Sequence, residues 1–255
     1  MIEVSGLRKQ FKLTRQMKKE LEGASKNGMV EAVAGISFAC QPGRIFSLLG
    51  PNGAGKTTTL RMIATMLKPT SGSIKVAGFD VLEQPQEVRS RLGFLTGTTK
   101  LYDRLTPSEL VKYYADLHKM DKAQYQTRRE EIFTRLGMHE FAKRRIAKLS
   151  SGMKQKVSIA RTIIHNPEIM VFDEPTAGLD VITSRNIIDL IKDFRDAGKT
   201  VIFSTHIMSE VSRLSDDLAI IHKGKLCYNG SYQDFEKNMQ SNSLEDEFLR
   251  LTEEG

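Results

Sequence analysis

Residues 50–57 have the types and spacing of a phosphate-binding loop. Two glycines with four residues between them are followed by Lys56 and Thr57. The glycines let successive backbone N–H groups point inward, and a helix after the loop would add the positive end of its dipole. Lys56 would then reach the β- and γ-phosphates of a nucleotide, and the Thr57 hydroxyl would ligate Mg²⁺. The residues predicted to bind ATP here are Gly50, Pro51, Asn52, Gly53, Ala54, Gly55, Lys56, Thr57 and Thr58.

Two adjacent carboxylates end an apolar run at 168–174. Asp173 is expected to hold Mg²⁺, and Glu174 to orient or deprotonate an attacking water. Phosphoryl transfer requires mainly positioning and charge neutralisation, so Lys56, the metal and Glu174 form a nearly complete catalytic set. The alternative is that both acids only cap the next helix. The pattern favours hydrolysis of ATP with Mg²⁺ as cofactor.

The elements around the loop have the order that it requires. An apolar run at 45–49, typical of a buried strand, precedes the loop, and residues 59–66 are predicted to form a helix. The alternative is a glycine-rich turn that binds no ligand. Such a turn would not require a strand, a lysine, a threonine and a helix in this order along the chain. Alternation of strand and helix predicts an α/β fold with a mostly parallel, buried sheet.

Further motifs resemble those of the ATP-binding-cassette (ABC) ATPases. Residues 149–153 read Leu-Ser-Ser-Gly-Met and resemble the family signature, Leu-Ser-Gly-Gly-Gln. Residues 177–180, which end in Asp180, resemble the D-loop, and Ser204-Thr205-His206 resembles the switch histidine. The order and separations match along nearly the whole chain. The chain therefore resembles an ATP-binding subunit of an ABC transporter.

The resemblance implies a head-to-tail dimer with ATP between the subunits. A helix is expected through 154–164, and its N-terminus would face the γ-phosphate held by the other subunit. The signature residues that would act in this way are Ser150, Ser151, Gly152 and Met153, of which Ser151 and Met153 depart from the family pattern. His206 would contact the γ-phosphate and keep Glu174 in register; the alternative is a hydrogen-bonded core histidine.

Two further positions follow from the family pattern. Gly97 stands where the family carries a glutamine that touches Mg²⁺, so Thr96, Thr98 or a water would have to substitute, or coupling would run through the backbone of this loop. Phe11, at the end of the first expected strand, stands where the family has an aromatic residue that stacks on adenine. A core phenylalanine is the alternative reading of Phe11.

The implied fold is a phosphate-loop (RecA-like) ABC ATPase core with an N-terminal antiparallel β section and an inserted all-helical subdomain. Antiparallel strands are expected at 2–11, 33–40 and 73–77, and a hairpin around 223–224. Residues 12–31 are interpreted as a solvated insertion. The expected divisions are 1–97 and 166–230 for the core, 98–165 for the helical subdomain, and 231–255 for a C-terminal helical tail.

The helical subdomain has its own start and stop signals. Thr106-Pro107-Ser108-Glu109 predicts a capping box. The helix that follows should present Leu110, Tyr113, Tyr114 and Leu117 on one face. Gly137 should end the next helix, expected over 124–136. A helix over 185–195 and a strand over 200–203 should follow the D-loop.

Composition narrows the classes of partner. The chain has 255 residues, 40% of them apolar and 27% charged, as in ordinary globular proteins. No apolar stretch approaches the roughly 18 residues of a membrane span, and the N-terminus lacks a secretory signal pattern. The two cysteines, Cys40 and Cys227, are expected to be reduced packing residues. The net charge of +7 suits a surface near anionic lipid headgroups, and without interleaved aromatic residues no nucleic-acid partner is expected.

The preferred hypothesis is an export motor that works with separate transmembrane permease subunits. Two copies, or this chain paired with a related cassette, would close on two ATP, with the chain cytoplasmic and peripheral on the inner face of the cell membrane. Residues 243–251 resemble the closing helix of ABC exporter ATPases, and with 12–31 and 96–99 they look most like the sodium-extrusion (NatA-type) branch. The alternatives are an ABC ATPase in a DNA or ribosome complex and a small-molecule kinase. The chain has neither tandem cassettes nor sustained heptads, and a kinase would not need the signature.

Overall fold

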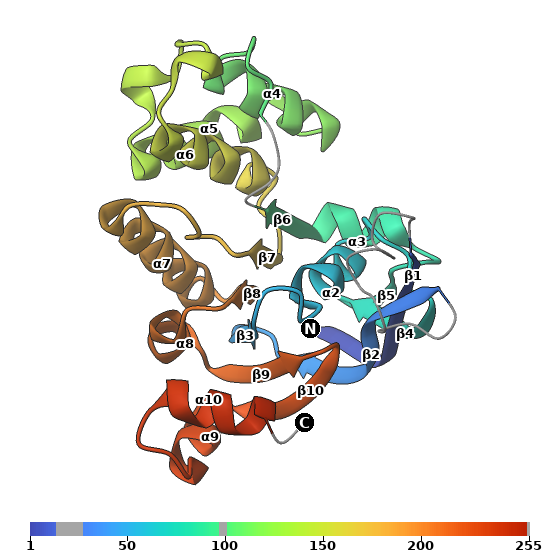
Figure 1. Cartoon of the computed structure of the whole chain (residues 1–255). Coiled ribbons are helices and arrows are strands. Elements are labelled where there is room, and N and C mark those ends of the chain that lie inside the picture. The colour runs from blue at the N-terminus through green and yellow to red at the C-terminus, as the bar shows by residue number, and fades with distance from the viewer. Residues whose placement is uncertain (14–27, 97–100, 254–255) are drawn as a thin grey trace.

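The computed structural model describes residues 1–13, 28–96 and 101–253 of the chain (Figure 1). Within them, four strands form an antiparallel sheet in the order β2-β1-β4-β5. The predicted antiparallel section is confirmed, and the short strand β5 adds to it. The strands are β1 (Ile2–Lys12), β2 (Met29–Cys40), β4 (Ser71–Val76) and β5 (Phe79–Asp80).

The first hairpin is longer than the sequence pattern predicts. β1 and β2 pair from Ile2 opposite Cys40 to Lys12 opposite Met29. Lys12 and residues 29–31 therefore belong to the strands and not to the expected insertion. The centre of that insertion, residues 14–27, lies outside the described residues.

A second sheet contains six strands of the described chain, in the order β10-β9-β3-β8-β7-β6. Its neighbours pair in parallel, except for the β9-β10 hairpin. Every residue of β3 and β7 is buried, as expected for parallel strands covered on both faces. The strands are β3 (Ile45–Leu49), β6 (Leu92–Thr96), β7 (Ile169–Asp173), β8 (Thr200–Thr205), β9 (Asp217–His222) and β10 (Lys225–Ser231).

Helices flank these sheets (Figure 1). The helix after the phosphate-type loop begins at Lys56 and ends at Ile63, earlier than the expected 59–66, and Thr65 has a left-handed φ of 60° just after it. The helix after the D-loop runs from Val181 to Asp196 and is longer than the expected 185–195. The helices packed on the sheets or following them are α2 (Lys56–Ile63), α3 (Pro85–Arg91), α7 (Val181–Asp196), α8 (Met208–Leu214), α9 (Tyr232–Asn238) and α10 (Leu244–Glu253).

A helical section stands above the sheets in Figure 1. The predicted capping box of α4 is confirmed: the Thr106 hydroxyl accepts from the Glu109 N–H, and the Glu109 carboxylate accepts from the Thr106 N–H. The predicted stop at Gly137 is confirmed as well, with φ 60° at the end of α5. The elements are α4 (Pro107–Leu117), α5 (Lys122–Leu136), the short 3-10 helices His139–Phe141 and Ile146–Lys148, and α6 (Ser151–Ile163).

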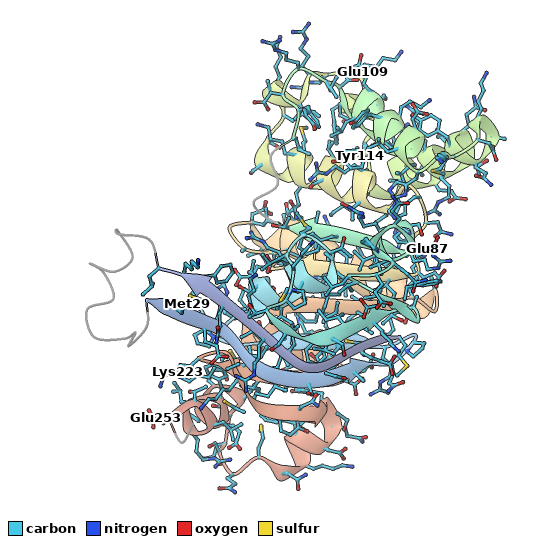
Figure 2. All side chains as sticks on the ribbon, turned by 90° about the vertical axis from the view of Figure 1, so that its right-hand side faces the viewer. Met29, Glu87, Glu109, Tyr114, Lys223 and Glu253 are labelled. Atoms are coloured by element: carbon cyan, nitrogen blue, oxygen red, sulfur yellow. The ribbon has the colours of Figure 1, made fainter. Side chains whose placement is uncertain are left out.

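The buried face of α4 differs from the predicted one. Tyr113 and Leu117 are 46% and 58% exposed, whereas Leu110 is fully buried and Tyr114 packs against the core. Figure 2 shows Tyr114 between the helices of this section and Glu109 at its outer end. The other buried residues of α4 are Pro107, Val111 and Ala115. The prediction for Tyr113 and Leu117 was wrong because α4 packs against its neighbours on one face only. That buried face is rotated by about one residue from the predicted one.

The C-terminal tail is held against β9 and β10. Phe235, Leu244 and Phe248 share an apolar cluster with Leu218 and Ile220 of β9. Beside this cluster, buried Glu247 pairs with Arg250 and accepts from the Gln240 and Ser241 N–H groups. These contacts, the Arg250 guanidinium foremost, hold the pKa of Glu247 well below its ordinary value. No helix in the described part of the chain is both long and apolar enough to cross a membrane.

Candidate nucleotide-binding site

The carboxyl ends of three neighbouring parallel strands bring the predicted catalytic residues together. β8 lies between β3 and β7, with Leu49 opposite Thr205 and Asp173 opposite Ser204. β3 leads into the 50–55 loop, β7 into Glu174, and β8 into His206. Loops at the carboxyl ends of a parallel sheet commonly form ligand sites.

Glycine is required at both ends of the loop. Gly55 has φ 106°, and a Cβ there would lie 2.4 Å from the Ala32 carbonyl oxygen. A Cβ at Gly50 would lie 2.3 Å from the Ile221 carbonyl oxygen. Real Cβ atoms do not approach backbone this closely, so the glycines let the loop pack against β2 and β9. The loop then enters α2 directly, where the first N–H groups lack partners within the helix.

Lys56 lies across the loop and is only 4% exposed. Its Nζ donates to the carbonyl oxygens of Gly50 at 2.6 Å and Pro51 at 3.1 Å, and lies 3.4 Å from Glu174 Oε1. A buried ammonium group needs such oxygen partners, because unpaired burial of charge is costly. The lysine is therefore held at the edge of the anion-binding turn.

Asp173 is joined to the loop through hydroxyl groups. Its Oδ1 accepts from Thr57 Oγ1 and from Ser204 Oγ, each at 2.8 Å, and the side chain is buried. Ser204 Oγ also accepts from the Glu174 N–H at 3.1 Å. Ser204 thus ties the two acidic residues together, a contact that the sequence reasoning did not assign. The signal available was its place beside His206 at the end of the adjacent strand.

Glu174 lies between the lysine and the histidine. Its Oε1 is 3.4 Å from His206 Nδ1, the same separation as from Lys56 Nζ. Glu174 has φ 48°, a left-handed conformation that non-glycine residues seldom adopt and that often occurs at functional sites. A carboxylate between a cation and a half-exposed imidazole can accept a proton from water and remain oriented.

Two cavities of the described residues adjoin the loop. The smaller, of about 130 Å³, is lined by residues 51–58 together with Ala32 and Glu174. The larger, of about 390 Å³, is lined by Asn52, Thr57, Arg61, Thr96, Asp173, Glu174 and Ala177. The two cavities share Asn52, Thr57 and Glu174, and Thr96 and Asp173 line the larger one. Both carboxylates therefore lie beside the loop and the N-terminus of α2, where a phosphate would bind.

The signature segment lies on a neighbouring surface. Ser150 caps α6, with its Oγ accepting from the Met153 N–H at 3.3 Å. Ser151 lines a separate hollow of about 570 Å³ with Glu174 and residues 177–179. None of residues 150–153, all of them described, lines either cavity at the loop. Within one chain the signature is therefore not brought to the loop.

The remaining predicted site residues lie in different places. Asp180 caps α7: its carboxylate accepts from the Thr183 N–H and hydroxyl, which lowers its pKa. Phe11 is 37% exposed, with the Lys9 ammonium 5.1 Å from its ring centroid. Gly97 and Thr98 lie outside the described residues.

Comparison with known proteins decides the family. The sequence matches the ABC transporter family over residues 33–177, more than half of the chain. The chain belongs to the ABC transporter family. It is 42% identical to the ABC transporter ATP-binding protein NatA of Bacillus subtilis (strain 168), over 86% of this chain and 89% of NatA.

Solved ABC structures share the fold. The structure of an ATP-binding subunit of an ABC transporter aligns with a TM-score of 0.83 and 25% identity, covering 99% of each chain. A dimeric ATP-binding cassette in a post-hydrolysis state, bound to ADP and Pi, aligns with a TM-score of 0.78 and 24% identity, covering 91% of this chain and 98% of the other. The predicted family and ABC ATPase fold are confirmed, and the chain is an ATPase of this family.

Proposed function

We propose that this ABC ATPase is the motor subunit of an export transporter, and that two subunits close on two ATP molecules. The observation that carries the proposal is the convergence of Lys56, Glu174 and His206 at the ends of β3, β7 and β8. The signature N-terminus of the same chain lies beside this site and not in it. A second subunit would supply the missing contact.

The side chains divide the work of hydrolysis. On ATP binding, Lys56 exchanges the Gly50 and Pro51 carbonyl oxygens for β- and γ-phosphate oxygens, and the loop N–H groups hold the remaining phosphate charge. Glu174 orients the attacking water and takes its proton as the oxygen attacks the γ-phosphorus. The bond to the β-phosphate oxygen breaks, which leaves ADP and phosphate. His206 holds Glu174 in place and donates to the γ-phosphate.

The residues present fit Mg²⁺. Thr57 Oγ1 and Asp173 Oδ1 are 2.8 Å apart, and hard oxygen donors of this kind suit the ion. Mg²⁺ is usually held by one or two protein groups together with substrate phosphates and water, so no dedicated cluster of protein ligands is required. Thr57 and Asp173 would hold the ion, which when bound would neutralise charge on the phosphates.

ATP would favour closure of two subunits because it makes more contacts in the closed dimer than in the open one. ATP bound to the loop of one subunit would meet the N-terminus of α6, capped by Ser150, only in the closed dimer. The free N–H groups at this helix end favour a γ-phosphate. Closure would push on permease subunits docked near 95–102, and hydrolysis would reopen the dimer. The chain would then be cytoplasmic and peripheral to the membrane through its permease.

The dimer is tested with Glu174→Gln, which should bind ATP without turning it over. With ATP and Mg²⁺ it should elute as a dimer in size-exclusion chromatography, and with ADP as a monomer. Adding Ser151→Asp should abolish the ATP-dependent dimer, because a carboxylate would face the partner's triphosphate, while an acid in the first turn still favours the helix. Ser151→Asn is the neutral control. A dimer that forms equally without ATP, or that Ser151→Asp leaves intact, would contradict the proposal.

Sodium ion is the cargo that we propose to test first. The support is the resemblance to the sodium-extrusion branch and the 42% identity to NatA. Inverted membrane vesicles prepared from the native cells that produce this chain should take up ²²Na⁺ when ATP is added. The same vesicles with Lys56→Ala should not. Equal uptake of ²²Na⁺ by the wild type and Lys56→Ala would contradict sodium as the cargo. The assignment as an ATPase would not be affected.

A further inference from the structure

Glu210 is a buried acid beside the catalytic loops that has no role in the mechanism above. It belongs to α8 and is 5% exposed. Among the described residues, no lysine, arginine or histidine forms an ion pair with it. Its carboxylate instead accepts hydrogen bonds from two hydroxyl groups: Oε2 accepts from Thr205 Oγ1 at 2.5 Å, and Oε1 accepts from Thr176 Oγ1.

The two threonines belong to the two segments that carry the catalytic pair. Thr176 follows Glu174 by two residues, and Thr205 directly precedes His206. Thr205 Oγ1 also accepts from the Ile207 N–H at 3.0 Å, which fixes the turn around His206. The Thr205 carbonyl oxygen accepts from the Gly50 N–H at 3.3 Å, so the same residue reaches the phosphate loop. Glu210 therefore links the segment that follows β7 to the end of β8.

We propose that Glu210 is a positioning residue that keeps Glu174 and His206 in contact. The proposal depends on the roles assigned to those two residues above. A carboxylate has acceptor sites on both oxygens, so it can hold two hydroxyl groups at a fixed spacing. The Nδ1 to Oε1 separation of 3.4 Å is then set by the clamp between Thr176 and Thr205. A small misplacement of a catalytic group can lower the reaction rate strongly and still leave substrate binding unchanged.

A polar core contact without a positioning role is the competing explanation. It predicts lower stability for Glu210 variants and no selective loss of kcat. Positioning predicts a loss of kcat with an unchanged KM for ATP, and a loss that depends on His206. The two explanations are therefore separable by kinetics.

The experiment measures ATP hydrolysis by folded variants of the full chain. Glu210→Gln leaves one acceptor oxygen for two hydroxyl groups, and Thr176→Val removes one donor while keeping the side-chain shape. Each should lower kcat about 10-fold to 100-fold and leave KM for ATP within about two-fold of wild type. Thr176→Ser, which keeps the hydroxyl, should retain most of the wild-type kcat. The control Glu236→Gln changes an exposed acid in α9 and should behave as wild type.

A double-mutant comparison tests the route through His206. In a His206→Ala background, Glu210→Gln should change kcat by less than about two-fold, because residues acting as a unit are not additive. An undiminished loss in that background would overturn the proposal, as would wild-type kcat in both Glu210→Gln and Thr176→Val. If Glu210→Gln does not fold, Thr176→Val alone decides. Wild-type turnover in His206→Ala itself would instead contradict the role given to His206 in the proposed function.

Discussion

At the scale of single residues, Glu174 links the lysine and the histidine of the site. It contacts both Lys56 and His206 and has a left-handed backbone. Glu174→Gln should lower phosphate release about 100-fold or more, since general-base catalysis contributes about that much. Nucleotide affinity should stay within about two-fold, because in the proposed mechanism Glu174 acts on the attacking water and not on the phosphates. Glu168→Gln, an exposed acid before the same strand, is the control, and wild-type turnover in Glu174→Gln would contradict the assignment.

Phe11 offers an optical test of adenine stacking. The chain contains no tryptophan, so Phe11→Trp would introduce a unique fluorophore at a ring that is 37% exposed. ATP should change its emission with a midpoint equal to the dissociation constant measured independently. Phe79→Trp, at the edge of the same sheet, should not respond. If Phe11→Trp stays silent while ATP binds normally, Phe11 does not contact the base.

Local residues of the site were predictable from the sequence, and contacts between strands were not. Lys56, Thr57 and Asp173 stand in a loop and a strand end whose geometry follows from their immediate neighbours. Ser204 and Glu210 act through hydroxyl and carboxylate contacts between β7, β8 and α8, about 30 residues apart in the chain. Such contacts depend on strand order, which no local pattern specifies.

At the scale of elements, the start of α4 is stabilised by its capping box. Thr106→Ala should lower the free energy of unfolding by about 1 kcal/mol, because the Glu109 N–H loses its side-chain acceptor. Urea titration followed by circular dichroism would measure this loss. Thr106→Ser keeps the acceptor and should remain within experimental error of wild type. An equal loss in both variants would show that the Thr106 methyl group and not its hydroxyl stabilises the helix.

In helix α4 the start was predicted correctly, whereas the buried face was not. Its cap and its proline act within one turn, so the start at Pro107 follows from the sequence alone. The face that is buried depends on α5 and α6. Leu110 and Tyr114 face those helices, whereas Leu117 does not, although all three satisfy helical spacing.

At the scale of the whole molecule, a pair of stacked histidines lies where the helical section meets the six-stranded sheet. The rings of His118 and His165 are 3.7 Å apart between centroids and nearly parallel. His165 Nε2 lies 3.3 Å from the Leu92 carbonyl oxygen, and its Nδ1 is buried without a hydrogen-bond partner in the described residues. Burial, and then the neighbouring His118, lower the pKa of His165 from 6.5 to about 4.

This stack should make stability depend on pH. Because the folded protein keeps His165 neutral, the unfolded chain binds more protons, and stability is lost as pH falls from about 6.5 towards about 4. Between pH 7.5 and 5 the wild type should lose on the order of 2 kcal/mol more than His165→Gln. His139→Gln, which changes an exposed histidine, should keep the wild-type dependence. Identical pH profiles for His165→Gln and the wild type would contradict this prediction.

The sequence predicted the type of each sheet, parallel or antiparallel, but not the order of the strands within it. Alternating elements predicted a parallel sheet, and the structure has one, but the order β10-β9-β3-β8-β7-β6 depends on pairings made across the whole chain. The extent of the first hairpin was also missed, because Lys12 and Met29 were assigned to the solvated insertion over 12–31, yet they pair as the last residues of β1 and the first of β2. Residues 14–27 and 97–100 lie outside the described residues, so the predictions for them remain predictions.

The closed end of that hairpin makes it an attachment point. The Leu13 N–H donates to the Gly28 carbonyl oxygen at 2.8 Å, beside the pairing of Lys12 with Met29. Figure 2 labels Met29 near the end of the long β1-β2 hairpin. A guest sequence spliced between Leu13 and Gly28 would start and finish one hydrogen bond apart, and each doubling of its length would cost only about 0.6 kcal/mol. A fluorescent protein or affinity epitope grafted there would label this ABC ATPase in living cells without a fusion at residue 1 or residue 255.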